Sequence, residues 1–153
     1  MKIIFLDIDG VLNSRRYDVH RKENEGNIDV TRLVILKQLI EKTNARIILT
    51  SSWRCHWDPN GENTDETGKE LIETFARYGI ELYGKTPQIN DDRAEEIRVW
   101  LNGHSDVDGF VIFDDIKLGW GELEPNVVKT DPRIGCGLEQ RHCEMAIRIL
   151  LSP

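Results

Sequence analysis

Several signatures of familiar protein classes are missing from this chain of 153 residues. It contains no run of about 18 consecutive apolar residues, which is the length that a membrane-spanning helix needs. The first apolar run, Ile3 to Leu6, is too short for a secretory signal peptide and is followed at once by acids. We therefore expect a cytoplasmic protein that does not act on membranes.

Cysteine and positive charge are also scarce. The three cysteines, Cys55, Cys136 and Cys143, fit no CxxC or zinc-finger spacing, and an odd number cannot pair completely. We expect reduced thiols in a reducing compartment. The formal net charge of −7 argues against a broad surface for nucleic acid. The segment from Ser14 to Lys22, with four Arg or Lys residues and one acid, is a local exception: either a solvated loop or a local nucleic-acid contact.

Short apolar runs alternate along the chain with segments of helical periodicity. The runs expected to form strands are residues 3–6, 46–52, 80–83, 109–115 and 126–131, and the segments expected to form helices are residues 29–44, 71–78, 91–101 and 138–149. Such alternation predicts an α/β fold, in which a parallel sheet is wrapped by helices through right-handed crossovers. The length is that of one ordinary domain, so we expect a single domain over residues 1–153.

Polar residues follow three of these runs at the point where each ends. The first run leads into Asp7 and Asp9, the second into hydroxyl residues at 50–52, and the fourth into Asp114 and Asp115. In an open parallel sheet, all these positions lie at the same edge, where functional residues gather. Clustered carboxylates repel one another unless a cation neutralises them, and an all-oxygen set suits Mg²⁺. With Mg²⁺ bound, an anionic phosphate can approach the acids, so the pattern predicts phosphoryl transfer.

The motifs that carry these residues resemble those of a known superfamily. "FLDIDGVLN", "IILTSS" and "VIFDD" are similar to the first, second and fourth motifs of the haloacid dehalogenase (HAD) superfamily, in the same order and on alternating strands. More narrowly, "DIDGVLN", "LTSSWR", "GKTP", "RAEEIRVWL", "FDD" and a late "GL" resemble the HAD domain of Swiss Army knife RNA-repair proteins. The resemblance spans nearly the whole chain. It implies a Rossmannoid three-layer α/β/α sandwich with about five parallel strands.

The resemblance also implies roles for the acids. Asp7 is expected to be the nucleophile that forms an aspartyl-phosphate, and Asp9 the acid that protonates the leaving oxygen and later activates water. Mg²⁺ is expected to bind the Asp7 side chain, the Asp9 main-chain carbonyl, and Asp114 or Asp115. Gly10 permits the tight turn that follows the strand and brings the backbone to the phosphate.

The remaining phosphate-binding residues are left with alternatives. The hydroxyl of the second motif is either Thr50 or Ser51, with Ser51 favoured. The charge-balancing residue, a Lys in most of the superfamily, is either Lys85 or Arg93, and Arg93 is expected at the positive N-terminus of a helix. Arg54 follows the second motif closely and is a further candidate for contact with the phosphate.

The chain leaves no room for a cap domain of the kind that closes over small substrates in this superfamily. About fifteen residues, 13–27, separate the first motif from the next expected helix, too few to build a core of their own. By resemblance, uncapped members act on large substrates. We therefore expect a Mg²⁺-dependent phosphohydrolase acting on a large phosphorylated substrate such as a polynucleotide terminal phosphate. The alternative is a non-catalytic phosphate-binding module or phospho-switch of HAD-like or receiver-like type.

Overall fold

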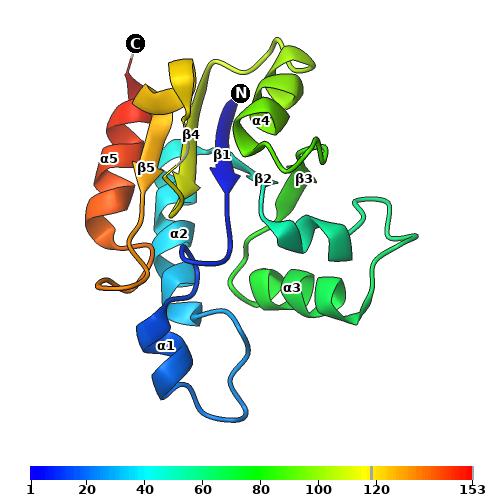
Figure 1. The fold of residues 1–153 in the computed structure, drawn as a ribbon, viewed down its shortest axis with the longest axis vertical. Coiled ribbons are helices and arrows are strands. Elements are labelled where there is room, and N and C mark those ends of the chain that lie inside the picture. The colour runs from blue at the N-terminus through cyan, green and yellow to red at the C-terminus, as the bar shows by residue number, and fades with distance from the viewer. Residues whose placement is uncertain (118, 153) are drawn as a thin grey trace.

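A central parallel sheet organises the protein in the computed structural model, which describes residues 1–117 and 119–152. The strands lie in the order β3-β2-β1-β4-β5, and each adjacent pair is parallel. Their bounds are β1 Lys2–Leu6, β2 Arg46–Leu49, β3 Leu82–Lys85, β4 Gly109–Asp114 and β5 Val127–Lys129. The first strand of the chain is therefore the central strand of the sheet (Figure 1).

Helices cover both faces of this sheet. Their bounds are α1 Arg15–His20, α2 Val30–Thr43, α3 Glu66–Arg77, α4 Arg93–Asn102 and α5 Gln140–Leu151, with 3-10 helices η1 Ser52–His56 and η2 Gly121–Asn126. Apolar side chains of α2, α3 and α5 form one buried cluster with the sheet, and those of α4 and η2 form a second. The fold is thus the expected three-layer α/β/α sandwich of the HAD-like type.

The strand β1 is apolar on both faces because it contributes to both clusters. Ile4 and Leu6 belong to the cluster that contains α2 and α5, whereas Ile3 and Phe5 belong to the cluster that contains α4. All four side chains are fully buried. Alternating side chains of a covered strand point to opposite layers, which is why this strand reads as a continuous apolar run rather than an alternating one.

Local signals in the sequence fix the ends of the helices beside the sheet. Asp29 caps α2 by accepting the backbone N–H of Thr31 at 3.0 Å, and Asn44 ends it in the left-handed conformation. Asp92 caps α4 by accepting the N–H of Glu95 at 3.0 Å. These caps place the first residue of α4, Arg93, at a fixed point beside the carboxyl edge of the sheet.

Several elements differ from their expected ranges; for example, β2 ends at Leu49 rather than residue 52, and α3 begins at Glu66 rather than residue 71. The third strand begins at Leu82 rather than residue 80, because the N–H of Ile80 bonds to the carbonyl of Phe75 and completes the end of α3. Within the basic segment after the first motif, residues 15–20 form the short helix α1, started by Ser14, whose hydroxyl accepts the N–H of Tyr17 at 3.2 Å. The described residues form no separate cap domain. None of their helices has the combined length and apolarity that crossing a bilayer requires.

Candidate active site

The ends of β1 and β4 meet where the sheet changes its direction of winding. From β1 the chain moves to β2 and β3 on one side, and then returns across the sheet through α4 to β4 on the other side. Backbone bonds continue past the strands at this point: the N–H of Asp7 donates to the carbonyl of Phe113 at 3.1 Å, and that of Thr50 to Leu6 at 2.9 Å. Residues that follow these strands therefore open into the crevice typical of ligand sites in such sheets.

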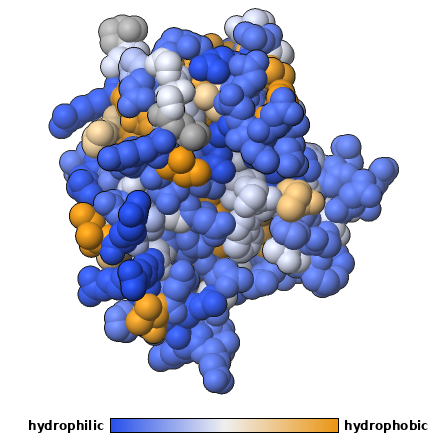
Figure 2. Space-filling view, in the orientation of Figure 1, coloured by the Kyte–Doolittle hydropathy of each residue, from blue (hydrophilic) through white to orange (hydrophobic). Residues whose placement is uncertain are grey.

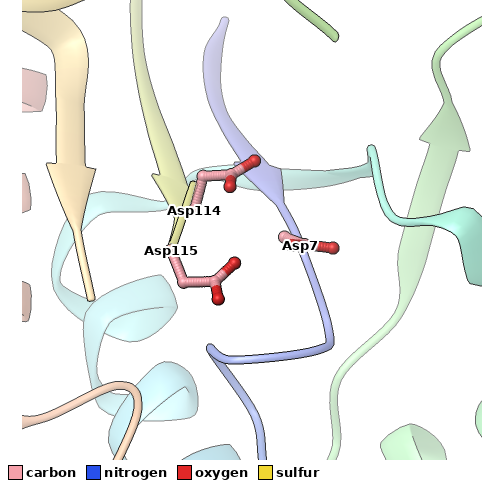
Figure 3. A group of neighbouring side chains, drawn as sticks. All are labelled: Asp7, Asp114 and Asp115. Atoms are coloured by element: carbon pink, nitrogen blue, oxygen red, sulfur yellow. The ribbon is translucent and has the colours of Figure 1, made fainter. Parts of the chain in front are cut away.

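Three carboxylates face one another across this crevice. Asp7, Asp114 and Asp115 each offer an oxygen, and these oxygens all lie within 4.8 Å of one another. Figure 3 shows the three side chains, one following β1 and two at the end of β4. Asp114 is fully buried and Asp7 is 4% exposed. A compact set of hard oxygen donors fits Mg²⁺, which prefers carboxylates and retains several waters.

Arg93 provides the positive charge nearest to these acids. Its Nη1 atom lies 2.9 Å from an oxygen of Asp7 and 2.5 Å from an oxygen of Asp114. Burial alone would lower the pKa of Arg93, but the charges of Asp7 and Asp114 outweigh it and raise that pKa. One guanidinium thus bridges the two buried carboxylates from the start of α4.

Lys85, the alternative charge-balancing residue, has a different place in the structure. It ends β3, and its Nζ atom donates to the carbonyl of Arg54 at 2.9 Å and to the carbonyl of Trp57. Lys85 therefore holds the backbone of η1 and does not join the carboxylate group. From the sequence, either Lys85 at a strand end or Arg93 at a helix start can be the charge-balancing residue. The fold shows that Arg93 is the one beside the acids.

Burial dominates the acid–base properties of Asp7. Desolvation raises the pKa of Asp7 from 3.8 to about 6, because Arg93 offsets only part of the cost of removing its charge from water. The neighbouring charge of Asp114 raises it further, whereas bonds from the backbone of Ile8 and the side chain of Ser51 lower it. Burial and the charge of Asp114 also raise the pKa of Asp115. A cation bound among these acids would favour their ionised forms.

Asp9 lies at the exposed side of the same crevice and is held by two neighbours. One carboxylate oxygen accepts the side-chain amide of Asn13 at 2.9 Å, and the other accepts the indole N–H of Trp53 at 3.0 Å. Asn13 is itself oriented because its side-chain oxygen accepts the N–H of Gly10 at 2.8 Å. From the sequence, no role was assigned to Asn13 or Trp53. The available signal was their place, because Asn13 ends the motif "FLDIDGVLN" and Trp53 belongs to "LTSSWR".

Gly10 is required by both conformation and space. Its φ angle is +80°, a region that residues with a side chain rarely adopt. A Cβ atom added here would lie 2.5 Å from Cγ of Asp115. Its carbonyl accepts the hydroxyl of Thr130 at 2.8 Å. The turn after β1 therefore packs directly against the acid at the end of β4.

Two hydroxyl residues at the end of β2 are fully buried, and they differ in their partners. The hydroxyl of Ser51 accepts the N–H of Trp53 at 3.3 Å, which caps η1, and it lies close enough to the carboxylate of Asp7 to lower the pKa of that acid. The hydroxyl of Thr50 has no hydrogen-bond partner within residues 1–117 and 119–152. Ser51 is thus the hydroxyl that the fold places against Asp7.

Arg54 is buried beside α4 rather than exposed in the crevice. Its Nη2 atom forms an ion pair with Glu96 at 2.7 Å, and its Nη1 atom donates to the carbonyl of Thr50. The Nε atom of Arg54 has no partner among the described residues, and the side chain lines a hollow that Arg93 and Ser52 also line. Its position next to Arg93 keeps it within the phosphate-binding candidates.

A single open crevice joins most of these groups. It is lined by Asp7, Asp9, Gly10, Arg93 and Asp115, and it continues past them toward α1 and the loop that follows β5. The structure therefore brings together the acids of the first and fourth motifs with Arg93. Of the hydroxyl residues of the second motif, Ser52 lines the crevice, whereas Thr50 and Ser51 are fully buried.

Comparison with known proteins agrees with this geometry. A family model described as the HAD domain in Swiss Army Knife RNA repair proteins matches residues 3–142. The matched range runs from β1 into the first turn of α5 and contains every candidate site residue. Searches of the curated proteins and of the solved structures gave no match.

Proposed function

This chain belongs to the family of HAD domains in Swiss Army Knife RNA repair proteins, and we propose on that premise that it is a Mg²⁺-dependent phosphohydrolase that forms an aspartyl-phosphate. The family makes it a HAD-type hydrolase. One observation carries the proposal: the buried carboxylate of Asp7 faces Arg93 and the acids of β4, while Asp9 stands beside it at the solvent side.

We assign the two chemical steps to Asp7 and Asp9. In the first, an oxygen of Asp7 bonds to the phosphorus of a phosphomonoester, the bond from phosphorus to the leaving oxygen breaks, and Asp9 gives that oxygen a proton. In the second, Asp9 takes a proton from water, which attacks the phosphorus and releases inorganic phosphate and the Asp7 carboxylate. Asn13 and Trp53 hold Asp9 in one orientation for both transfers.

The site fits a Mg²⁺ ion. We assign three ligands to it on the basis of the converging carboxylate oxygens: the side chain of Asp7, the side chain of Asp114 or Asp115, and the main-chain carbonyl of Asp9. When bound, Mg²⁺ supplies positive charge that neutralises phosphate oxygens and stabilises the transition state. Arg93 and the hydroxyl of Ser51, with Thr50 and Arg54 behind them, complete the donors for the phosphate.

We assign the substrate to the terminal phosphate of a polynucleotide. The crevice that contains Asp7 and Asp9 is open, and the described residues form no cap over it, so a phosphate attached to a large molecule can enter. The family to which the chain belongs is found in RNA repair proteins, which favours nucleic-acid ends. The cytoplasm is the expected location, because it keeps the free thiols of Cys55, Cys136 and Cys143 reduced.

The test is release of inorganic phosphate, with Mg²⁺ or with EDTA, from a small phosphate ester and from oligonucleotides phosphorylated at the 3′ or 5′ end. Asp7→Asn is expected to abolish release, because an amide does not act as the nucleophile, while circular dichroism stays unchanged. Asp106→Asn is the matched control, since Asp106 is exposed in the turn before β4, at the opposite edge of the sheet.

Retained turnover in Asp7→Asn would contradict the assignment of the nucleophile. Binding of phosphate without release by the unaltered protein would instead support a non-catalytic module. Acid-quenched mass spectrometry adds an independent readout, because the unaltered protein is expected to carry one phosphoryl group during turnover and the variant none.

A further inference from the structure

The crevice extends beyond the reacting groups to a basic rim. Arg15 at the start of α1 and Arg133 in the loop between β5 and α5 both line the crevice that contains Asp7 and Asp9. Both side chains are exposed. They are 118 positions apart in the sequence, so only the fold makes them parts of one surface. We call Arg15, Arg133, Val19 and Ile134 the arginine rim.

Backbone bonds fix the two halves of the arginine rim to each other. The N–H of Arg15 donates to the carbonyl of Pro132 at 3.0 Å. The side chain of Asp131 accepts the N–H of Arg133 at 3.0 Å and so holds the loop in a turn. The N–H of Leu138 donates to Val11 at 2.7 Å, which ties the same loop to the turn after β1. The rim is therefore rigidly connected to the segment that carries Asp9.

The two guanidinium groups of the rim are available for a ligand. Neither Arg15 nor Arg133 forms an ion pair in the part of the chain that the structure describes. Arg21, from the same basic segment, differs because its Nη1 atom donates to Asn27 at 2.5 Å. Asp18 also lines the crevice and places one acid beside the two arginines of the rim.

Each arginine of the rim has an exposed aliphatic neighbour. Val19 follows Arg15 by four residues, on the same side of α1, lines the crevice and is 70% exposed. Ile134 follows Arg133 directly and is 91% exposed. Figure 2 shows separate apolar patches over α1 and over the loop before α5, with strongly hydrophilic atoms between them. Cationic groups with apolar neighbours suit a chain in which charged phosphates alternate with less polar sugars and bases.

We propose that the arginine rim binds the sugar–phosphate backbone of a single-stranded polynucleotide next to its terminal phosphate. This inference rests on the proposed function, because the terminal phosphate itself is placed at Asp7. A polynucleotide has a further phosphodiester at every nucleotide, which gives Arg15 and Arg133 anions to bind. A phosphopeptide has no anion at every backbone linkage, so it offers the rim no regularly spaced phosphates beside the one at the centre of the site.

The experiment compares kcat/KM for a phosphorylated single-stranded oligonucleotide with kcat/KM for a small phosphate ester. Arg15→Ala and Arg133→Ala are each expected to lower the ratio of the two values about tenfold, mainly through KM for the oligonucleotide. The slope of log kcat/KM against log salt concentration should become shallower by about 0.7 for each arginine removed. Arg16→Ala is the matched control: Arg16 is exposed on α1 next to Arg15 but does not line the crevice.

An unchanged ratio in the Arg15→Ala/Arg133→Ala double variant would overturn the proposal, and so would a higher kcat/KM for a phosphopeptide than for the oligonucleotide. Fluorescence anisotropy of Asp7→Asn with the same oligonucleotide separates this failure from failure of the proposed function. If Asp7→Asn binds the oligonucleotide in a salt-sensitive way and both rim substitutions weaken that binding, the proposal for the rim is supported even when the unaltered protein releases no phosphate. If the unaltered protein releases phosphate but the rim substitutions do not weaken binding, the proposal for the rim is overturned and the proposed function stands.

Discussion

Arg93 is the residue on which the electrostatics of the site depend most directly. Its guanidinium lies against Asp7 and Asp114, two carboxylates that are buried and therefore costly to leave unpaired. A lysine occupies the corresponding role in most of the HAD superfamily, and the two are not equivalent. A planar guanidinium offers several donors in a fixed geometry, whereas an ammonium acts as a compact point charge.

Substitutions of Arg93 are expected to distinguish the contribution of its positive charge from that of its planar guanidinium geometry. Arg93→Met retains the apolar stem and removes the charge, so kcat/KM for phosphate release should fall at least about 100-fold, the effect of losing one charged donor in a reacting site. Arg93→Lys should recover part of that loss. Arg98→Met is the control on the same helix, because Arg98 pairs with Glu95 and Glu122 at the surface. Equal activities of Arg93→Met and Arg98→Met would contradict the assigned role.

At the scale of elements, α4 is joined to the segments that frame the phosphate site through one buried acid. Glu96 is 1% exposed, and its Oε1 atom accepts the guanidinium of Arg54 from η1 at 2.7 Å and the N–H of Ile89 at 2.9 Å. These bonds fix η1 and the loop before α4 relative to the helix. Arg93, one turn earlier, takes its position from the same attachment.

Neutralising this acid is expected to lower the free energy of unfolding. Glu96→Gln leaves the charge of Arg54 buried without a counter-ion, which costs about 3 kcal/mol. Glu95→Gln, one residue away, removes only an exposed pair with Arg98 at 3.3 Å and should cost less than about 1 kcal/mol. Urea denaturation measures both. A loss in Glu96→Gln no larger than in Glu95→Gln would show that the buried pair contributes little to stability.

At the scale of the whole molecule, the acidic crevice couples folding stability to pH and to metal. Burial raises the pKa of Asp7 from 3.8 to about 6, so the folded protein binds a proton more tightly than the unfolded chain does. The resulting stability is fully present below about pH 4 and is lost as pH rises through about 6. Integrated over that range it amounts to about 3 kcal/mol at most. The raised pKa of Asp115 acts in the same direction.

Mg²⁺ is expected to reverse this pH dependence, because the ion binds the ionised carboxylates and competes with protons. The increase in Tm caused by Mg²⁺ should therefore be larger at about pH 7.5 than at about pH 5. In Asp7→Asn, the increase in Tm caused by Mg²⁺ at about pH 7.5 should be smaller than in the unaltered protein. Without metal, the variant should also lose less stability between about pH 5 and about pH 7.5. Differential scanning fluorimetry with Mg²⁺ or EDTA measures both effects. An increase in Tm that is the same at both pH values would contradict metal binding at Asp7.

The local parts of this protein are determined by its sequence alone. The run Ile3 to Leu6 is apolar because both faces of β1 are covered, and the acids that follow it lie at the carboxyl edge because the strands are parallel. Asp29 and Asp92 fix the starts of α2 and α4 through their own side chains. Each of these features depends on neighbouring residues and on a repeating pattern, so it can be predicted without knowing the packing.

Only the tertiary structure decided between residues whose chemistry is similar. Lys85 and Arg93 both follow from the sequence as cations near the site, yet Lys85 holds backbone carbonyls of η1 while Arg93 bridges the acids. The pairing of Arg15 with Arg133 likewise depends on a loop that docks against the turn after β1. Contacts between residues far apart in the chain depend on how the elements pack, and no local pattern encodes that packing.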